Sequence, residues 1–173
     1  MKEGWEDEED LLARIIGLIR NCDALSEYAY RIRVAPAVLD AESIINKHYG
    51  DEYRDWYEAN HDDKYNPNKF AKPIDLILYK DDVPKLAILF VLSRWSKAPS
   101  LSSNPLSGWI AHWCKDNNVS RLSFYLNKPN KSHYILRRIC EVLGEIPDNG
   151  YRFRMGKDQE YKIMAEDDKE VMN

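Results

Sequence analysis

The stretch from Lys72 to Trp95 constrains the fold of this chain more than any other part of its sequence. Two aliphatic runs, Ile74–Tyr79 and Leu86–Leu92, flank a short segment whose aspartates and proline favour a tight reversal. This pattern predicts a β-hairpin. Because Leu86–Leu92 is apolar at every position, we expect helices to cover both faces of this strand. The hairpin should then lie at the centre of a sheet.

The segments before the hairpin predict helices. An acidic cluster over residues 6–10 begins an amphipathic helix over residues 6–20, where negative charge complements the positive end of the helix dipole. Further helices are predicted over Asp23–Arg33, over a short segment that ends at Gly50, and over Asp51–Asn60. The last of these carries an aromatic stripe that we assign to core packing, made by Tyr53, Trp56 and Tyr57. Since acidic side chains outnumber basic ones here, we expect an acidic helical layer over residues 1–60.

The segments after the hairpin predict the rest of the sheet and two more helices. In order, they are a helix over Gly108–Asn117 capped by Ser107, a strand over Ser120–Leu126, a helix over His133–Leu143 that ends at Gly144, and a second hairpin over residues 151–164. We therefore expect one α/β (α+β) domain over residues 1–164, whose small mixed sheet and flanking helices occupy residues 72–164. Residues 165–173 should form a flexible tail.

Composition limits the class of protein. The formal net charge of −4 gives no strong overall attraction to nucleic acid or to anionic membranes. The three cysteines are widely spaced, which argues against a zinc finger and against a disulfide framework. No apolar run is long enough to span a bilayer, and the acidic N-terminus differs from a signal peptide. We expect a cytoplasmic protein with no membrane partner.

The segment Pro73-Ile74-Asp75 places a carboxylate directly after a proline at the start of a predicted strand. Together with the order of the predicted elements, this motif resembles the PD-(D/E)XK (restriction-endonuclease-like) nucleases, in which such an aspartate binds a metal. That family places an acid and a lysine in the next strand, where this chain has Phe90 and Leu92. Its reaction needs carboxylates to hold a divalent cation and a lysine to steady the attacking water, so the apolar pair predicts an inactive centre.

Two interpretations of Asp75 stay open. In the first it is a strand-entry residue with a structural role, the chain has no catalytic residue, and no metal or other cofactor is expected. In the second, the resemblance implies that Asp75 binds Mg²⁺ with a carboxylate displaced to a preceding helix, from Glu42 or Glu52. No glycine-rich phosphate loop and no hydrolase motif supports another chemistry.

The segment 121–138 contains basic and aromatic residues but no acidic residue. If its strand, turn and helix start lie on one surface, they form a basic patch suited to nucleic-acid phosphates or to an acidic protein. The candidate binding residues are Arg121, Lys128, Lys131, Arg137, Arg138, Arg152 and Arg154. Alternatively, these side chains solvate a helix face and pair with the acidic N-terminal layer.

Three functional hypotheses follow, in order of preference. The first is a non-catalytic adaptor on a degenerate nuclease-like scaffold, which has a protein partner and, by analogy, belongs to a phage, a mobile element or a defence system. The second is a nucleic-acid-binding module that uses segment 121–138. The third is a divalent-metal-dependent nuclease centred on Asp75.

Overall fold

The structure, a computed structural model, describes residues 7–92, 104–126 and 129–146. The second hairpin predicted over residues 151–164 and the predicted tail at 165–173 lie outside these ranges. So do three of the candidate basic residues, Lys128, Arg152 and Arg154.

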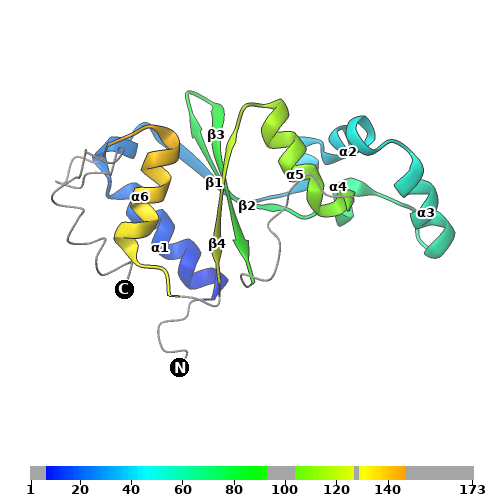
Figure 1. The fold of residues 1–173 in the computed structure, drawn as a ribbon, viewed down its shortest axis with the longest axis horizontal. Helices are drawn as coiled ribbons and strands as arrows, with labels where there is room; N and C mark the ends of the chain where they lie inside the picture. The colour runs from blue at the N-terminus through cyan, green and yellow to red at the C-terminus, as the bar shows by residue number, and fades with distance from the viewer. Residues whose placement is uncertain (1–6, 93–103, 127–128, 147–173) are drawn as a thin grey trace, which may run out of the picture.

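A four-stranded mixed sheet forms the centre of the molecule (Figure 1). Its strands lie in the order β1 (Tyr28–Val34), β2 (Ile74–Lys80), β3 (Val83–Val91) and β4 (Ser120–Tyr125). The β1–β2 and β2–β3 pairs are antiparallel, whereas β3 and β4 are parallel. The predicted hairpin is therefore confirmed, and its two strands hold the two central positions of the sheet. The fold is of the predicted mixed α/β class.

The hairpin turn consists of Asp81 and Asp82, which have φ values of 54° and 64°. Positive φ at both central residues is the backbone of a two-residue turn whose twist matches that of paired strands, and aspartate tolerates this region better than most residues. Pairing resumes at once with Lys80 opposite Val83, so β3 begins earlier than the predicted Leu86.

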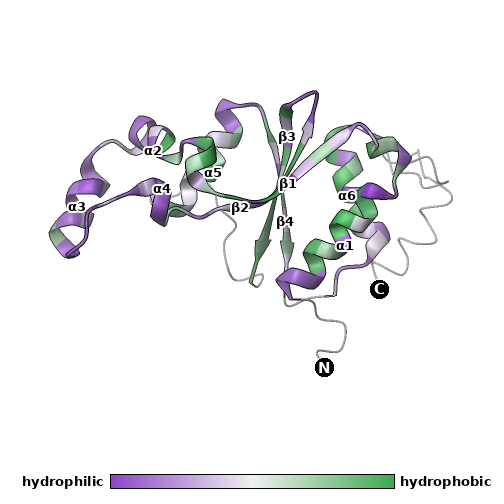
Figure 2. Ribbon diagram, turned by 180° about the vertical axis from the view of Figure 1, so that it is seen from behind, coloured by the Kyte–Doolittle hydropathy of each residue, from purple (hydrophilic) through white to green (hydrophobic). Residues whose placement is uncertain are grey.

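Helices cover both faces of β3, as the sequence predicts. Its residues from Leu86 to Val91 are all buried. Leu86, Ile88 and Phe90 join a core with α1 (Glu8–Arg20) and α6 (Ser132–Leu143). The alternate residues Ala87 and Leu89 join a second core with α2 (Ala41–Tyr49) and α5 (Pro105–Asp116). The two helix pairs lie on opposite sides of the sheet (Figures 1 and 2).

The prediction of a helix over residues 23–33 is wrong. A single 3-10 turn at Asp23–Leu25 precedes the edge strand β1. The segment Tyr28–Val34 is mostly exposed, and pairing with β2 overrides its helical spacing. Residues 1–60 also do not form one helical layer, because α1 and α2 lie on opposite faces with β1 between them in sequence.

The remaining predicted helices are present, although α5 begins at Pro105 and not at the predicted Gly108. The helix α2 ends at Gly50 and α6 ends at Gly144, and both glycines have positive φ. Asn104 caps α5 in place of the predicted Ser107, since its side chain accepts a hydrogen bond from the backbone N–H of Leu106. The loop that precedes β2 contains a short helix, α4 (Pro67–Phe70). Within the described residues, no helix combines the length and the apolar character needed to cross a bilayer.

The helix α3 (Glu52–Asn60) occupies the end of the molecule furthest from α1 and α6 (Figure 1). It is largely hydrophilic, in contrast to the apolar central strands (Figure 2). The residues of the predicted aromatic stripe differ in their exposure. Tyr57 is buried, as expected of core packing, whereas the side chain of Trp56 is 53% exposed.

Candidate functional site

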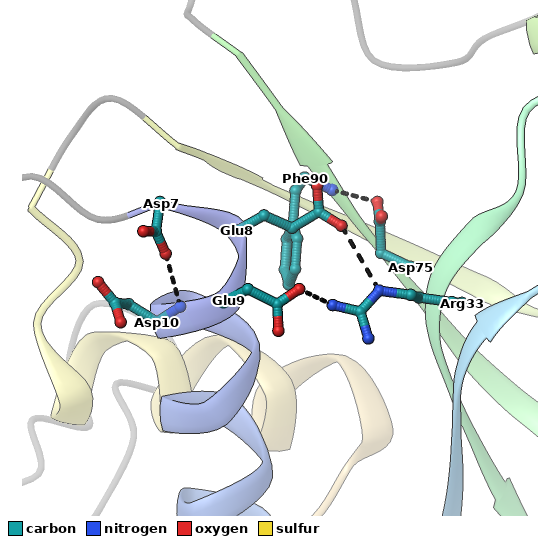
Figure 3. A network of polar contacts seen from close by, with 7 residues as sticks. All are labelled: Asp7, Glu8, Glu9, Asp10, Arg33, Asp75 and Phe90. Atoms are coloured by element: carbon teal, nitrogen blue, oxygen red, sulfur yellow. Dashed lines mark hydrogen bonds and ion pairs between the residues drawn. The ribbon is translucent and has the colours of Figure 1, made fainter.

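The carboxylate of Asp75 replaces a missing piece of the backbone ladder. Pairing between β2 and β3 extends only as far as Leu76 opposite Ile88. Beyond this pair, Oδ2 of Asp75 accepts a hydrogen bond from the backbone N–H of Phe90 at 2.8 Å (Figure 3). A buried N–H without an acceptor is costly, so this side chain satisfies a donor that the strands leave unpaired.

Asp75 lies within a network of charges. Burial is the main cause that raises the pKa of its carboxyl above the ordinary value, and the nearby charge of Glu8 adds to this. The hydrogen bond from Phe90 and the positive charges of Lys72 and Arg33 act in the opposite direction. The carboxylate therefore has partners in the protein, although its burial disfavours the charged form.

Arg33 links the start of α1 to the edge of the sheet. Its guanidinium contacts the carboxylate of Glu9, and its Nε lies 3.9 Å from Oε1 of Glu8 (Figure 3). Its backbone has a φ of 47°, an uncommon value for a residue other than glycine. The regular pairs on either side are Ile32 with Leu76 and Val34 with Ile74. The irregularity thus occurs directly opposite Asp75.

The acids proposed to assist Asp75 lie elsewhere. Glu42 begins α2 and lines a cavity of about 530 Å³ next to the loop around Lys64 and Lys69. Glu52 is exposed at the start of α3. Within the described residues, no three histidine, cysteine or acidic side chains are arranged to hold a metal ion. The acid that does interact with Asp75 is Glu8 on α1, where the sequence indicated only a favourable interaction with the helix dipole.

The candidate basic residues that the structure describes do not all share one surface. Arg121 on β4 pairs with Ala87, whose side chain belongs to the core beneath α5. Arg137 and Arg138 lie on α6, which covers the opposite face. Both pair with Glu141 on the same helix, with N–O distances of 3.9 and 3.5 Å. The pairing of these two residues with Glu141 agrees with the alternative that basic side chains solvate a helix face.

The remaining basic candidate in the described residues is Lys131, which precedes the first residue of α6.

Arg137 has a second contact besides Glu141. Its guanidinium lies 5.1 Å from the centre of the Tyr134 ring, and its side chain is only 14% exposed. A guanidinium in this position stabilises the helix surface. It presents little charge to a phosphate group.

A cluster that the sequence analysis missed joins α2 to α5. The rings of His48 and His112 are stacked 4.0 Å apart, and Nε2 of His48 lies 2.8 Å from Oδ2 of Asp116. Lys47 contacts the same carboxylate at 3.2 Å. Burial, assisted by the neighbouring His48, lowers the pKa of His112. The two histidines are distant in sequence, so only the packing of α2 against α5 shows that they are neighbours.

The side of α3 that faces the protein is an aromatic cluster. Tyr57 stacks on His61 with ring centres 3.9 Å apart, and its hydroxyl bonds to Asp63. Tyr65 lies within 5.5 Å of the rings of both Tyr53 and Tyr57. The cluster attaches α3 to the following loop.

Comparisons of the chain with known protein families, curated proteins and solved structures found no match.

Proposed function

We propose that this chain is a non-catalytic interaction protein on a nuclease-like scaffold. The observation that carries the proposal is the hydrogen bond from the backbone N–H of Phe90 to the carboxylate of Asp75. In a metal-dependent nuclease this carboxylate would have to bind a cation. Here it completes the pairing of two central strands, which is a structural role.

The neighbouring side chains support the same proposal. Ile88 and Phe90 of β3 are buried in an apolar core, so the positions of β3 next to Asp75 carry neither an acid nor a lysine. The carboxylates of Glu8 and Glu9 lie against the guanidinium of Arg33. A guanidinium supplies the positive charge that a divalent cation would supply in an enzyme, and it does so without binding a reactive water.

Nucleic-acid binding through segment 121–138 is a weaker candidate. Counterion release requires several basic side chains to reach phosphates together. Arg121 belongs to one face of the sheet, whereas Arg137 and Arg138 are on the helix that covers the other. Their local pairing with Glu141 reduces the charge available to a polyanion.

A nuclease assay tests the proposal directly. Labelled single- and double-stranded DNA and RNA are incubated with the full chain in the presence of Mg²⁺ or Mn²⁺, and retardation of the same nucleic acids is measured at low and moderate salt. We expect neither cleavage nor a salt-sensitive complex. Metal-dependent cleavage that disappears in Asp75→Asn would overturn the proposal in favour of the enzyme, and salt-sensitive retardation lost in Arg121→Gln would favour the nucleic-acid-binding module.

The partner is sought by cross-linking the full chain in the cells that produce it, followed by reconstitution of the complex from purified components. A complex that re-forms without nucleic acid supports the proposal. Failure of every cross-linked protein to re-form a complex with the purified chain counts against it.

A further inference from the structure

Within the described residues, the helix α3 packs against the protein through the side that carries Tyr53 and Tyr57. Its inward side chains Tyr53 and Tyr57 pack with the aromatic cluster that includes Tyr65. The hydroxyl of Tyr57 donates to Asp63 Oδ2 at 3.2 Å, and Asn60 bonds back to the carbonyl of Trp56 at 2.7 Å. The contacts of Tyr53 and Tyr57 with residues outside the helix fix its orientation, so its outward face is presented by a preorganised element.

The outward face combines an aromatic ring with negative charge. Glu52, Asp55, Trp56 and Ala59 follow one another at the i, i+3, i+4 and i+7 positions of one helix face, and all four are exposed. Trp56 is 53% exposed, and its ring contacts those of Tyr53 and His61. A large apolar ring left half in water gains free energy when a partner covers it.

The negative charge on this face is not compensated by its neighbours. Within the described residues, the carboxylates of Glu52 and Asp55 make neither an ion pair nor a side-chain hydrogen bond. The one basic residue of α3, Arg54, contacts Asn46 at 3.2 Å and Asp51 at 3.7 Å. Its guanidinium is therefore engaged at the other side of the helix start.

We propose that this face, formed by Glu52, Asp55 and Trp56, docks a short cationic segment of a partner protein. An arginine side chain can stack its planar guanidinium on the indole while it donates hydrogen bonds to a carboxylate one turn away. Lysine offers the charge but not the flat surface, so arginine should bind more tightly. Nucleic acids and anionic membranes carry the wrong charge for this face.

This inference rests on the proposed function, since it names the chemistry of the partner. The probe is a fluorescein-labelled hexa-arginine peptide, titrated with the full chain at low salt and followed by fluorescence anisotropy. We expect Trp56→Ala to weaken binding about fivefold, because the ring supplies the stacking surface. Trp56→Phe should lose less. The double variant Glu52→Gln/Asp55→Asn should also bind several-fold more weakly, and hexa-lysine should bind more weakly than hexa-arginine.

A matched control separates this site from general attraction between a basic peptide and an acidic protein. Asp81→Asn/Asp82→Asn removes the same charge from the hairpin turn, which is far from α3 (Figure 1). Equal weakening in this control, or no change in Trp56→Ala, would overturn the inference. Circular dichroism of each variant checks that the fold is retained.

A second copy of the chain is the competing occupant of this face. Sedimentation that shows a dimer dispersed by Trp56→Ala would assign the face to self-association and would also overturn the inference. None of these results decides whether the chain cleaves nucleic acid, so failure of the docking site and failure of the proposed function are distinguishable.

Discussion

Two acidic regions of this molecule differ in the interaction partners that the rest of the protein provides for their carboxylates. At the start of β2, the carboxylate of Asp75 accepts a backbone hydrogen bond and lies near the positive charges of Arg33 and Lys72. On the outward face of α3, Glu52 and Asp55 have no such partners in the described part of the chain. The type of residue therefore does not identify a functional carboxylate, whereas the interaction partners of the carboxylate do.

The surroundings of the two regions differ in the same direction. Phe90 beside Asp75 is 5% exposed and belongs to the core under α1 and α6, whereas Trp56 beside Asp55 is 53% exposed. The first aromatic ring stabilises the fold, and the second leaves apolar surface available to a partner. We therefore interpret the sheet as a scaffold and α3 as the element that it presents.

The largest effect is expected when a charge is placed next to Asp75. Phe90→Lys places a lysine next to Asp75, but it removes a buried ring and introduces an ammonium group into an apolar core. We expect a loss of at least about 3 kcal/mol in the free energy of unfolding, measured in urea. Trp56→Lys on α3 should cost less than about 1 kcal/mol, because that position is exposed.

A folded Phe90→Lys variant that cleaves DNA in the presence of Mg²⁺ would reverse the comparison. The region around Asp75 would then be a latent catalytic site.

The next effect separates the hydrogen bond of Asp75 from its charge. Asp75→Ala leaves the N–H of Phe90 without an acceptor and should lower the free energy of unfolding by about 1–3 kcal/mol. Asp75→Asn keeps an acceptor and removes a charge that burial disfavours, so it should stay within about 1 kcal/mol of the parent. Urea unfolding at pH 7 measures both. Equal losses in the two variants would mean that the negative charge, and not the hydrogen bond, stabilises this region.

Much of this architecture follows from the sequence. The uninterrupted aliphatic run of β3 requires cover on both faces, and the aspartates at 81 and 82 favour the observed turn. The strand β1 was missed because Leu25, Tyr28, Ala29 and Ile32 also fit a helical spacing. Its partner β2 lies more than forty residues later in the chain. Only that pairing decides between the two structures.

The candidate sites were less predictable, since they depend on contacts between distant segments. The sequence placed Asp75 at the start of a strand but could not show that Phe90 donates to it or that Arg33 lies nearby. Trp56 and Tyr57 are adjacent in one aromatic stripe, yet the cluster with Tyr65 buries only Tyr57. The sequence predicts this helix, but its periodicity does not show that the helix packs against a loop and not against a sheet.

A third carboxylate, Asp116, belongs to a cluster whose contribution to folding stability should depend on pH. It is bonded to His48, which stacks on His112, and the pKa of Asp116 is lowered mainly by that hydrogen bond. The pKa of His112 is lowered from its ordinary value of 6.5 by burial, with His48 and Lys115 acting in the same direction and Asp116 opposing them. The unfolded chain therefore binds a proton at this histidine at a higher pH than the folded chain does.

Folding stability should be complete above pH 6.5 at this site and should fall as the pH drops toward the lower pKa of folded His112. Thermal unfolding between pH 7.5 and 5 measures the decline. His112→Gln removes the titrating group but keeps a polar side chain, so the variant should lose part of the decline. An identical pH profile in the variant would exclude His112 as its source.

The smallest effect concerns the ion pairs of Arg33, which sharpen the distinction between a structural and a metal-binding role for the neighbouring acids. The side chains of Arg33, Glu8 and Glu9 are 43%, 47% and 74% exposed, so water screens their interaction. Arg33→Ala should change the free energy of unfolding by less than about 1 kcal/mol. Arg33→Gly should be at least as stable as Arg33→Ala, because glycine adopts the observed φ of 47° without strain.

The Arg33→Ala variant also tests whether the carboxylates of α1 bind a metal ion once the guanidinium of Arg33 is removed. If these carboxylates have only a structural role, the melting temperature of Arg33→Ala in Mg²⁺ or Mn²⁺ should be no higher than its melting temperature in NaCl at the same ionic strength. A rise specific to the divalent ion, lost again when Asp75→Asn is added, would mean that Arg33 occupies the position of a metal. Asp75 would then have to be grouped with carboxylates that bind a ligand, and the contrast with the face of α3 would no longer hold.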